Sequence, residues 1–230
     1  MYNRFPNISH ASSCGKFTEH LLCALVLLIL VGAPCRSSAQ IWYLGGKAGA
    51  TFSNYKAKTP WKEVSNVGYT VGIAAYKQLK KNTGINLELQ YIQKGYYHKI
   101  CNDIYDKLEA SYIEIPVMFD YTFIFPSLQN FKGHLNAGFY AAYWMSGEYK
   151  MKGFDETSED FDFNASEASR FDFGPNAGGR IEYILKNGSL SLDFRYEIGV
   201  LDLQKQINDN TANTNRAFII GISYLKLLNN

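Results

Sequence analysis

Cysteine is scarce in this chain, and most of it lies near the N-terminus. Of the four cysteines, Cys14, Cys23 and Cys35 precede residue 40, which leaves Cys101 alone in the remainder. A single thiol cannot close an internal disulfide and has no companion at a metal-ligand spacing. The sequence therefore excludes a disulfide scaffold and a cysteine-based metal site. We expect Cys101 to be an unpaired loop residue.

The chain also lacks an excess of either charge. Lys and Arg number 23 against 21 for Asp and Glu. The difference disappears when residues 1–39 are set aside, because that segment holds Arg4, Lys16 and Arg36 against Glu19. There is no basic excess that would indicate a nucleic-acid partner, and no acidic tail. We therefore expect no nucleic-acid binding.

Long apolar runs are absent after the N-terminal region, and the run within that region is short. Leu21–Ala33 carries no charge but falls short of the roughly 20 residues that a membrane-spanning helix needs. Arg4 and Lys16 precede it, and Ser37-Ser38-Ala39 follows with small residues at the positions that a signal peptidase reads. The sequence therefore predicts a secretory signal peptide over residues 1–39.

Cleavage before Gln40 would leave residues 40–230 as one domain of about 190 residues. An uncleaved membrane anchor is the alternative interpretation of the N-terminus. A lipoprotein signal at Cys35 fits poorly, because Pro34 stands immediately before it.

From about residue 42 onward, apolar and polar side chains alternate in separate runs. In residues 84–92 the odd-numbered positions from Ile85 to Tyr91 are apolar, and the even positions between them are Asn86, Glu88 and Gln90. This period of two indicates strands, because a helix would place apolar residues three and four apart. The pattern predicts an all-β fold of eight strands, at residues 42–53, 67–79, 84–96, 111–124, 134–149, 170–185, 189–201 and 215–227.

The predicted connections alternate in length. Residues 80–83 and 186–188 are tight, Asn187-Gly188 being a strong hairpin signal, and 125–133 is of middle length. The others are longer and polar: 54–66, 97–110, 150–169 and 202–214. Outer-membrane barrels have an even number of strands, short periplasmic turns and longer external loops. We therefore predict an eight-stranded antiparallel up-and-down transmembrane β-barrel with both termini in the periplasm.

A soluble β-sandwich or lipocalin-like barrel has the same period of two, so periodicity alone does not decide between water and membrane. The apolar faces are large, however, as on the fifth strand with Leu135, Phe139 and Tyr143. Aromatic residues also gather near strand ends, where membrane barrels carry interfacial belts: Trp42, Tyr43, Tyr96, Tyr97, Tyr121, Phe123, Phe171 and Phe173. These features favour the outer membrane.

Three segments resemble one family of small barrels. Gly45–Asn54, Tyr112–Val117 and Gly174–Gly179 resemble strands of the PorT-like outer-membrane β-barrel family, and the resemblance covers essentially the whole chain after residue 39. It implies a small integral outer-membrane barrel and carries over no catalytic residue. Some members of that family are associated with protein secretion. The chain departs from many outer-membrane barrels by ending Leu-Leu-Asn-Asn instead of in Phe, and Tyr224 is the aromatic residue that we expect to serve in assembly.

Ionisable residues fall on the polar face of the strands. They are Lys47, Glu88, Glu114, Asp120, Asp172, Arg180, Glu182, Asp193, Arg195 and Glu197. Paired carboxylates and arginines could serve acid–base chemistry. An eight-stranded barrel has almost no channel, however, so charges inside it must pair with one another. We predict that they form a salt-bridged plug, which argues against an open pore.

A lipid-modifying enzyme would need a nucleophile beside a histidine. His98 and His134 are the histidines after residue 39, and they are predicted to lie at opposite ends of the barrel. Ser111 is the nearest serine after His98, and neither histidine has a recognisable serine–acid arrangement in the sequence. We therefore expect no enzymatic activity and assign no catalytic, cofactor-binding or metal-binding residue, and no cofactor.

Two of the long connections have a distinct composition. Residues 150–169 are acidic but lack the spacing of a calcium loop, so we expect a solvated surface loop in which Phe154, Phe161 and Phe163 could contact a protein. The first connection is basic and could meet lipopolysaccharide phosphates through Lys56, Lys58, Trp61 and Lys62.

The leading hypothesis is an integral outer-membrane barrel with a structural or interaction role through its extracellular loops. Its expected partners are outer-membrane lipids and proteins of envelope assembly or secretion. A membrane-embedded lipid-modifying enzyme and a narrow channel are the alternatives.

Overall fold

The computed structural model describes residues 41–56, 62–99, 104–153, 156–163, 169–201 and 214–228. The predicted signal peptide and Cys101 lie outside these ranges, as do residues 57–61 of the predicted first long connection and 202–213 of the last. Within the described ranges, no helix is long and apolar enough to cross a membrane.

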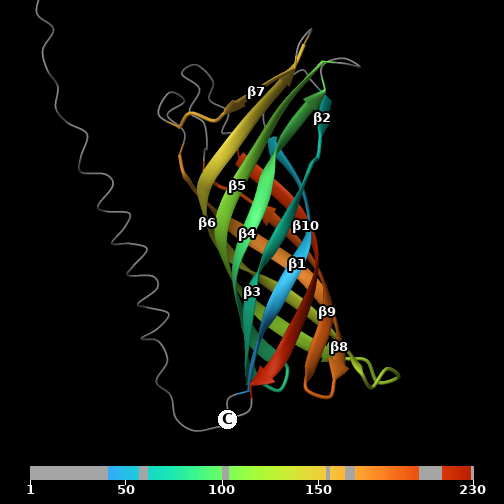
Figure 1. Ribbon diagram of the computed structural model, residues 1–230. Coiled ribbons are helices and arrows are strands. Elements are labelled where there is room, and N and C mark those ends of the chain that lie inside the picture. Colours follow the sequence, from blue (N-terminus) through green and yellow to red (C-terminus); the bar gives the residue numbers. More distant parts are fainter. Residues whose placement is uncertain are drawn as a thin grey trace, which may run out of the picture. The chain divides into compact units, whose positions relative to one another are not determined.

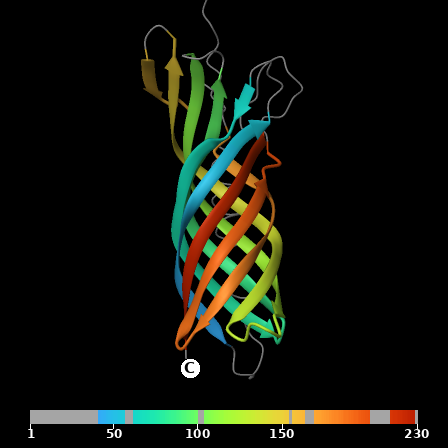
Figure 2. The same ribbon diagram turned by 90° about the vertical axis from the view of Figure 1, so that its right-hand side faces the viewer.

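The described residues form ten strands (Figures 1 and 2). They are β1 (Trp42–Lys56), β2 (Lys62–Val64), β3 (Asn66–Lys80), β4 (Thr83–Lys99), β5 (Tyr105–Ile124), β6 (Phe131–Lys152), β7 (Glu156–Asp160), β8 (Phe171–Leu185), β9 (Gly188–Ile198) and β10 (Thr214–Leu228). Every pairing is antiparallel, and eight strands close into a ring in the order β1-β3-β4-β5-β6-β8-β9-β10. The short strands β2 and β7 add to β4 and β6 outside the ring. The predicted eight-stranded up-and-down barrel is confirmed.

Closure of the ring depends on the pairing of the first and last strands. β1 and β10 pair over their full length, from Trp42 opposite Leu228 to Lys56 opposite Thr214. This register places both ends of the barrel domain beside the connections 81–82, 125–130 and 186–187. We call this the turn end, and the opposite end, where the longer connections lie, the loop end.

The barrel has its apolar face outside and its polar face inside. Val67, Leu135 and Ile222 point outward with exposures of 63%, 61% and 58%, whereas Glu114 and Asp120 on β5 are fully buried. A soluble barrel would do the reverse, because water favours exposed charges and buried apolar groups. The inverted arrangement is that of a barrel surrounded by lipid.

The strands are longer than predicted at the loop end. β5 and β6 have 20 and 22 residues, and their pairing continues to Tyr105 opposite Lys152. β4 likewise pairs with β5 as far as Lys99, so the predicted connection 97–110 is wrong and shrinks to residues 100–104. A transmembrane strand takes about 9–11 residues. The surplus therefore rises above the ring (Figure 2).

This surplus forms a continuous sheet that we call the projecting sheet. Its members pair in the order β2-β4-β5-β6-β7. It consists of β2, residues 95–99 of β4, 105–110 of β5, 146–152 of β6, and β7. Its outward face changes from apolar to charged, from Ile113 to Glu109 and Lys107 along β5, which marks the edge of the lipid-facing belt.

The predicted aromatic belts are partly wrong. Trp42 and Tyr121 point outward, but Tyr43 packs against Tyr76 with ring centroids 5.9 Å apart, and Tyr96 stacks on His98 at 4.6 Å. Adjacent residues of a strand face opposite sides, so two neighbouring aromatics cannot both reach lipid.

Candidate functional site

The interior of the barrel holds the ionisable side chains. All ten residues predicted to face the lumen are at most 9% exposed. Sequence reasoning missed Lys94, which is fully buried, and did not place His134 inside, although it is 3% exposed. The same period of two that assigned Glu88 and Gln90 to the lumen also assigns Lys94, so the signal was present.

One cluster of charges lies in the middle of the lumen. Glu88 on β4 accepts hydrogen bonds from Lys47 Nζ at 3.1 Å and from Arg195 Nη2 at 2.6 Å. Asn86 donates a third bond at 2.9 Å. These donors come from β1, β9 and β4, so this carboxylate connects three separate walls of the barrel. The predicted pairing of charges across the lumen is confirmed at Glu88.

A second cluster lies nearer the loop end and is centred on Lys94. Its Nζ lies 2.6 Å from Glu114 Oε2 and 2.8 Å from Glu197 Oε2, and 4.3 Å from the centre of the Tyr140 ring. Arg195 Nη1, 3.7 Å from Glu197 Oε1, links this cluster to the middle one. Glu114 therefore pairs with Lys94, a lysine that sequence reasoning did not place in the lumen.

The interior contains more acids than cations, and neutral donors bind some of the surplus carboxylates. Asp172 accepts hydrogen bonds from the Tyr140 hydroxyl at 3.1 Å and from Asn215 at 3.3 Å. Asp193 accepts one from the Ser223 hydroxyl at 2.8 Å. Buried polar groups need such partners because isolation from water is costly. The result is a filled, cross-linked interior.

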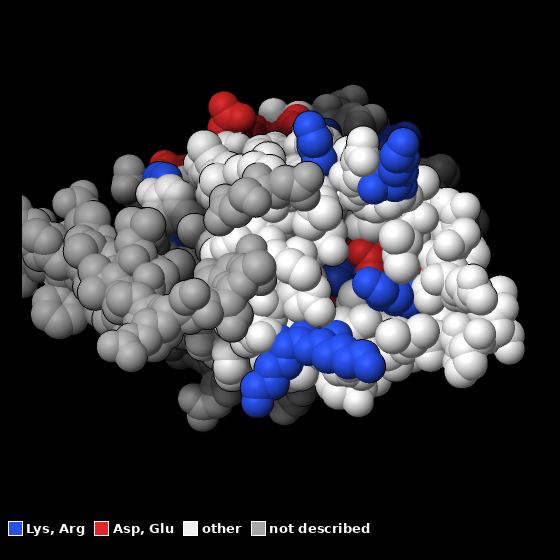
Figure 3. Space-filling model, turned by 90° about the horizontal axis from the view of Figure 1, so that it is seen from below, with Lys and Arg blue, Asp and Glu red and all other residues white. Residues whose placement is uncertain are grey.

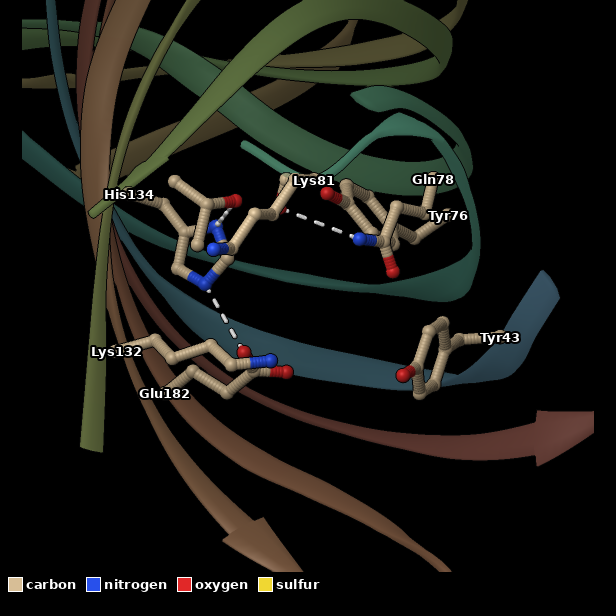
Figure 4. Close-up of a pocket in the computed structure, with 8 residues that line it drawn as sticks. Tyr43, Tyr76, Gln78, Lys81, Lys132, His134 and Glu182 are labelled. Atoms are coloured by element: carbon tan, nitrogen blue, oxygen red, sulfur yellow. Dashed lines mark hydrogen bonds and ion pairs between the residues drawn. The ribbon is translucent and has the colours of Figure 1, made fainter. Parts of the chain in front are cut away.

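The cluster at the turn end surrounds His134 and lies beside a small pocket (Figure 4). His134 Nδ1 lies 2.7 Å from Asp120 Oδ1, and Nε2 lies 3.0 Å from Glu182 Oε2. Arg180 Nη2 donates to Asp120 Oδ2 at 3.3 Å. The pocket is lined by Tyr43, Tyr76, Gln78, Lys81, Thr122, Lys132, His134 and Glu182. Its free space is about that of one water molecule.

The chemistry available to His134 is limited by how its two nitrogens are used. Thr122 Oγ1 lies 3.1 Å from Nδ1, the same nitrogen that faces Asp120, while the other nitrogen faces Glu182. A nucleophile–base–acid relay needs the hydroxyl and the acid on different nitrogens. Asp120 and Arg180 Nη2, at 3.2 Å, also face Nδ1, and Glu182 faces Nε2. The arrangement therefore fits a buried polar network and not an activated hydroxyl.

His98 lies at the loop end, as predicted, and has a different environment. Its Nδ1 is 3.8 Å from Asp106 Oδ2 on the neighbouring strand. Ser111 accepts a 2.7 Å hydrogen bond from the Tyr91 hydroxyl. Five register positions separate Asp106, the residue opposite His98, from Ser111, so the serine is far from the imidazole.

Aromatic residues fill the lumen at the loop end. Trp144 is fully buried, and the rings of Tyr112, Phe161 and Phe163 lie 5.8, 4.6 and 4.9 Å from it. Phe161 and Phe163 are therefore partly buried against Trp144, and their contact with another protein stays a prediction. Both follow β7, whose pairing with β6 carries them back over Trp144. Phe154 lies outside the described residues.

The outward face of the projecting sheet carries a network of charges. Lys150 Nζ lies 3.0 Å from Glu109 Oε2 and 3.1 Å from Glu148 Oε2, and Lys107 also pairs with Glu109. Partial burial favours the neutral form of Glu109, but the bonds from the two lysines outweigh it and hold the pKa of this carboxyl below its usual range. The acidic strand β7 pairs with β6 and so belongs to this sheet. The expectation of a solvated surface loop is wrong for these residues.

Among the described residues, no group of three or more His, Cys, Asp and Glu side chains is arranged to hold a metal ion. The basic residues of the first connection that were predicted to meet lipopolysaccharide have no described side chains.

Solved outer-membrane barrels resemble this chain in fold. Neisserial surface protein A is 15% identical, with a TM-score of 0.41 over 79% of this chain and 95% of that one. The Ail protein of Yersinia pestis is 10% identical, with a TM-score of 0.41 over 82% and 99%. The outer membrane enzyme PagL is 12% identical, with a TM-score of 0.41 over 80% and 98%. A search of curated protein sequences found no significant match.

A family model described as "Outer membrane protein beta-barrel domain" matches residues 38–205. This match covers most of the barrel and agrees with the closed ring, its lipid-facing apolar surface and its charged interior. The chain is therefore a member of the outer membrane protein β-barrel domain family and resides in the outer membrane.

Proposed function

We propose that this protein is a closed outer-membrane barrel that holds the projecting sheet outside the cell, where the sheet binds another protein. The observation that carries the proposal is the continuation of β4, β5 and β6 beyond the lipid-facing belt as a paired sheet. Strands that only had to cross the membrane would need no such extension.

The projecting sheet is built to be stiff. Its inward face packs on the aromatic cluster through Leu108 and Tyr149, and its pairing continues the barrel ladders without interruption except for one bulge. The bulge lies between Ser111 and Tyr112, where Met145 of β6 has no partner on β5. A surface held in one shape loses little conformational entropy on binding. The network of lysines and carboxylates outside offers a polar contact surface.

The filled interior supports a non-conducting and non-enzymatic role. The ion-paired clusters and the ring of Trp144 occupy the lumen from end to end, which leaves no evident path for ions. His134 has its nitrogens engaged by carboxylates. We therefore rank a narrow channel and a lipid-modifying enzyme below an interaction role.

The resemblance of Tyr112–Val117 and two glycine-rich segments to the PorT-like family supports a partner in secretion or envelope assembly. Under this proposal the turn end and both termini face the periplasm, and the projecting sheet faces outward. Outer-membrane lipids surround the belt.

Site-specific cross-linking in native membranes tests this function. A photoreactive amino acid replaces Lys107 or Lys150 on the projecting sheet, and Phe119 on the lipid face serves as the matched control. We expect a protein adduct of one reproducible mass from both sheet positions and none from Phe119. When the photoreactive amino acid replaces Glu148 instead, the charge reversal K107E/K150E in the same chain should remove the adduct. If the sheet positions give no adduct, or the same adducts as Phe119, the proposed function is wrong.

A further inference from the structure

Lysines collect at the turn end of the barrel, as seen from that end in Figure 3. Lys77 and Lys226 point outward near the ends of β3 and β10, and Lys80 and Lys186 stand at the β3–β4 and β8–β9 turns. We call these four residues the lysine arc. Lys81 and Lys132, which line the small pocket, add further positive charge at the mouth of the lumen.

The strand register makes the arc continuous. Lys226 lies opposite Gly188 of β9, next to the turn that holds Lys186, and opposite Leu44 of β1. On the other side of β1, Lys77 lies opposite Trp42, two residues before Leu44. Neighbouring strands are about 4.8 Å apart. The arc therefore follows one side of the barrel rim across adjacent strands, with β1 in its centre.

No carboxylate among the described residues neutralises this arc from outside. The acids nearest the turn end on their strands are Asp120, Glu182 and Asp193, all buried in the lumen. Their carboxylates are engaged by His134, Arg180 and Ser223. The charged face of the projecting sheet is different, because lysines and glutamates pair with each other there. The arc is thus an unbalanced positive surface.

The arc lies at the margin of the lipid-facing belt. Lys226 stands between Tyr224 and Leu228, both 46% exposed, and Lys77 is two residues from Leu79, which is 48% exposed. The ammonium of Lys77 lies 5.0 Å from the centre of the Trp42 ring. Tryptophan and lysine with this placement are interfacial anchors, because the apolar part contacts acyl chains and the cation reaches the headgroup layer.

We propose that the lysine arc binds anionic phospholipid headgroups in the leaflet at the turn end, which is the periplasmic leaflet in the topology proposed above. A soluble acidic protein could not reach cations that stand between lipid-facing side chains, whereas a lipid phosphate lies at that depth. Each lysine near a membrane surface should raise the local concentration of anionic lipid about fivefold. The outward pair Lys77 and Lys226 should therefore enrich anionic lipid around this side of the barrel.

Spin-labelled lipids measure this preference in the purified, folded barrel. The protein is reconstituted in phosphatidylcholine with trace spin-labelled phosphatidylglycerol or phosphatidylcholine, and the motionally restricted fraction of each label gives a relative association constant. For the native protein we expect several-fold preference for phosphatidylglycerol, weakened by high salt. The preference should fall toward unity in K77Q/K226Q and persist in K77R/K226R. The matched control K107Q/K150Q removes two lysines from the projecting sheet and should keep it.

The proposal is overturned if the native protein shows no preference, or if K77Q/K226Q keeps it. Equal loss in K107Q/K150Q would also overturn it, because the effect would then follow total charge and not the arc. Insensitivity of the native preference to salt would exclude an electrostatic origin without any variant. None of these outcomes bears on partner binding by the projecting sheet, which is tested separately by cross-linking.

Discussion

At the residue scale, two of the interior cations each contact two acids. Lys94 contacts both Glu114 and Glu197, and Arg195 contacts both Glu88 and Glu197. A buried charge without a partner costs several kcal/mol. Removal of one shared cation therefore takes a charge partner from two carboxylates at once. This arrangement ties β4, β5 and β9 together through side chains as well as through the backbone ladder.

Replacement of Arg195 tests this account. Arg195→Ala should lower the free energy of unfolding by about 3 kcal/mol, because Glu88 loses its 2.6 Å partner and keeps Lys47 as its cation and Asn86 as a neutral donor. Adding Glu88→Gln should restore a large part of the loss. Folding is followed in urea by the mobility shift of the unheated barrel on gels. The exposed control Lys186→Gln should change stability by less than about 0.5 kcal/mol. Unchanged stability in Arg195→Ala with loss of a measurable activity would favour a catalytic lumen.

At the element scale, the transition from barrel to projecting sheet depends on local backbone geometry. Gly95 on β4 has φ of +153°, and a Cβ there would come within 1.9 Å of the Leu108 carbonyl oxygen. Its amide donates to the Ser53 hydroxyl at 2.9 Å, which ties β4 to β1 where the sheet begins to rise. Only glycine combines this φ with so close an approach of the neighbouring strand.

Gly95→Ala should therefore weaken the projecting sheet more than the barrel. We expect a loss of about 1–3 kcal/mol and faster cleavage by protease added to intact cells. Gly153→Ala is the matched control, because a Cβ at that position meets no atom within 4 Å. Equal protease resistance of the two variants would contradict a structural role for Gly95. The urea transition of the barrel reports whether the ring itself is affected.

At the scale of the whole molecule, the two ends of the barrel differ in chemistry. The turn end carries the lysine arc together with Trp42 and Leu228, and the loop end carries the projecting sheet. The proposed sidedness in the membrane rests on this difference, since short turns face the periplasm in outer-membrane barrels.

Single cysteines in a Cys101→Ser background test the sidedness. An impermeant maleimide added to intact cells should label Ser158→Cys on β7, which is exposed, and should leave Asn82→Cys and Asn187→Cys unlabelled until the cells are lysed. Under the proposed topology the turns lie in the periplasm and are shielded by the membrane, whereas β7 lies outside the cell. Labelling at the two asparagine positions without lysis, and none at Ser158, would reverse the topology.

The proposed non-conducting role predicts that the protein carries no current. In planar bilayers the purified protein should give no discrete conductance steps, because ion pairs and the Trp144 cluster occupy the interior. The control is the same preparation after heat denaturation. Regular steps that disappear in a variant with a larger lumen side chain, such as Ala142→Phe, would show that ions pass through the barrel.

Cleavage of the signal peptide before Gln40 stays a prediction. Sequencing of membrane-extracted protein should begin at Gln40, since the small residues before it suit signal peptidase and Leu21–Ala33 is too short to span the bilayer. Retention of residues 1–39 in the inner membrane would contradict both the cleavage site and the location.

The sequence by itself determined the fold class, the number of ring strands and the face to which each interior charge belongs. These follow from a period of two, which is a local property that any strand of sufficient length displays. The same period also places Lys94 on the lumen face. The predicted bounds were poorest at the loop end, where charged residues such as Lys107 and Glu109 replace the apolar set and the membrane pattern ends.

Only the tertiary structure decided which charges meet. Lys94 and Glu197 are 103 residues apart, and their contact depends on how the closed ring staggers β4 against β9. The same closure brings Asp120 and Glu182 to opposite sides of His134, and the pairing of β7 with β6 carries Phe161 onto Trp144. The side chains that meet across a barrel are set by its stagger and closure. These depend on the register of all the strands together, so no single strand's sequence predicts them.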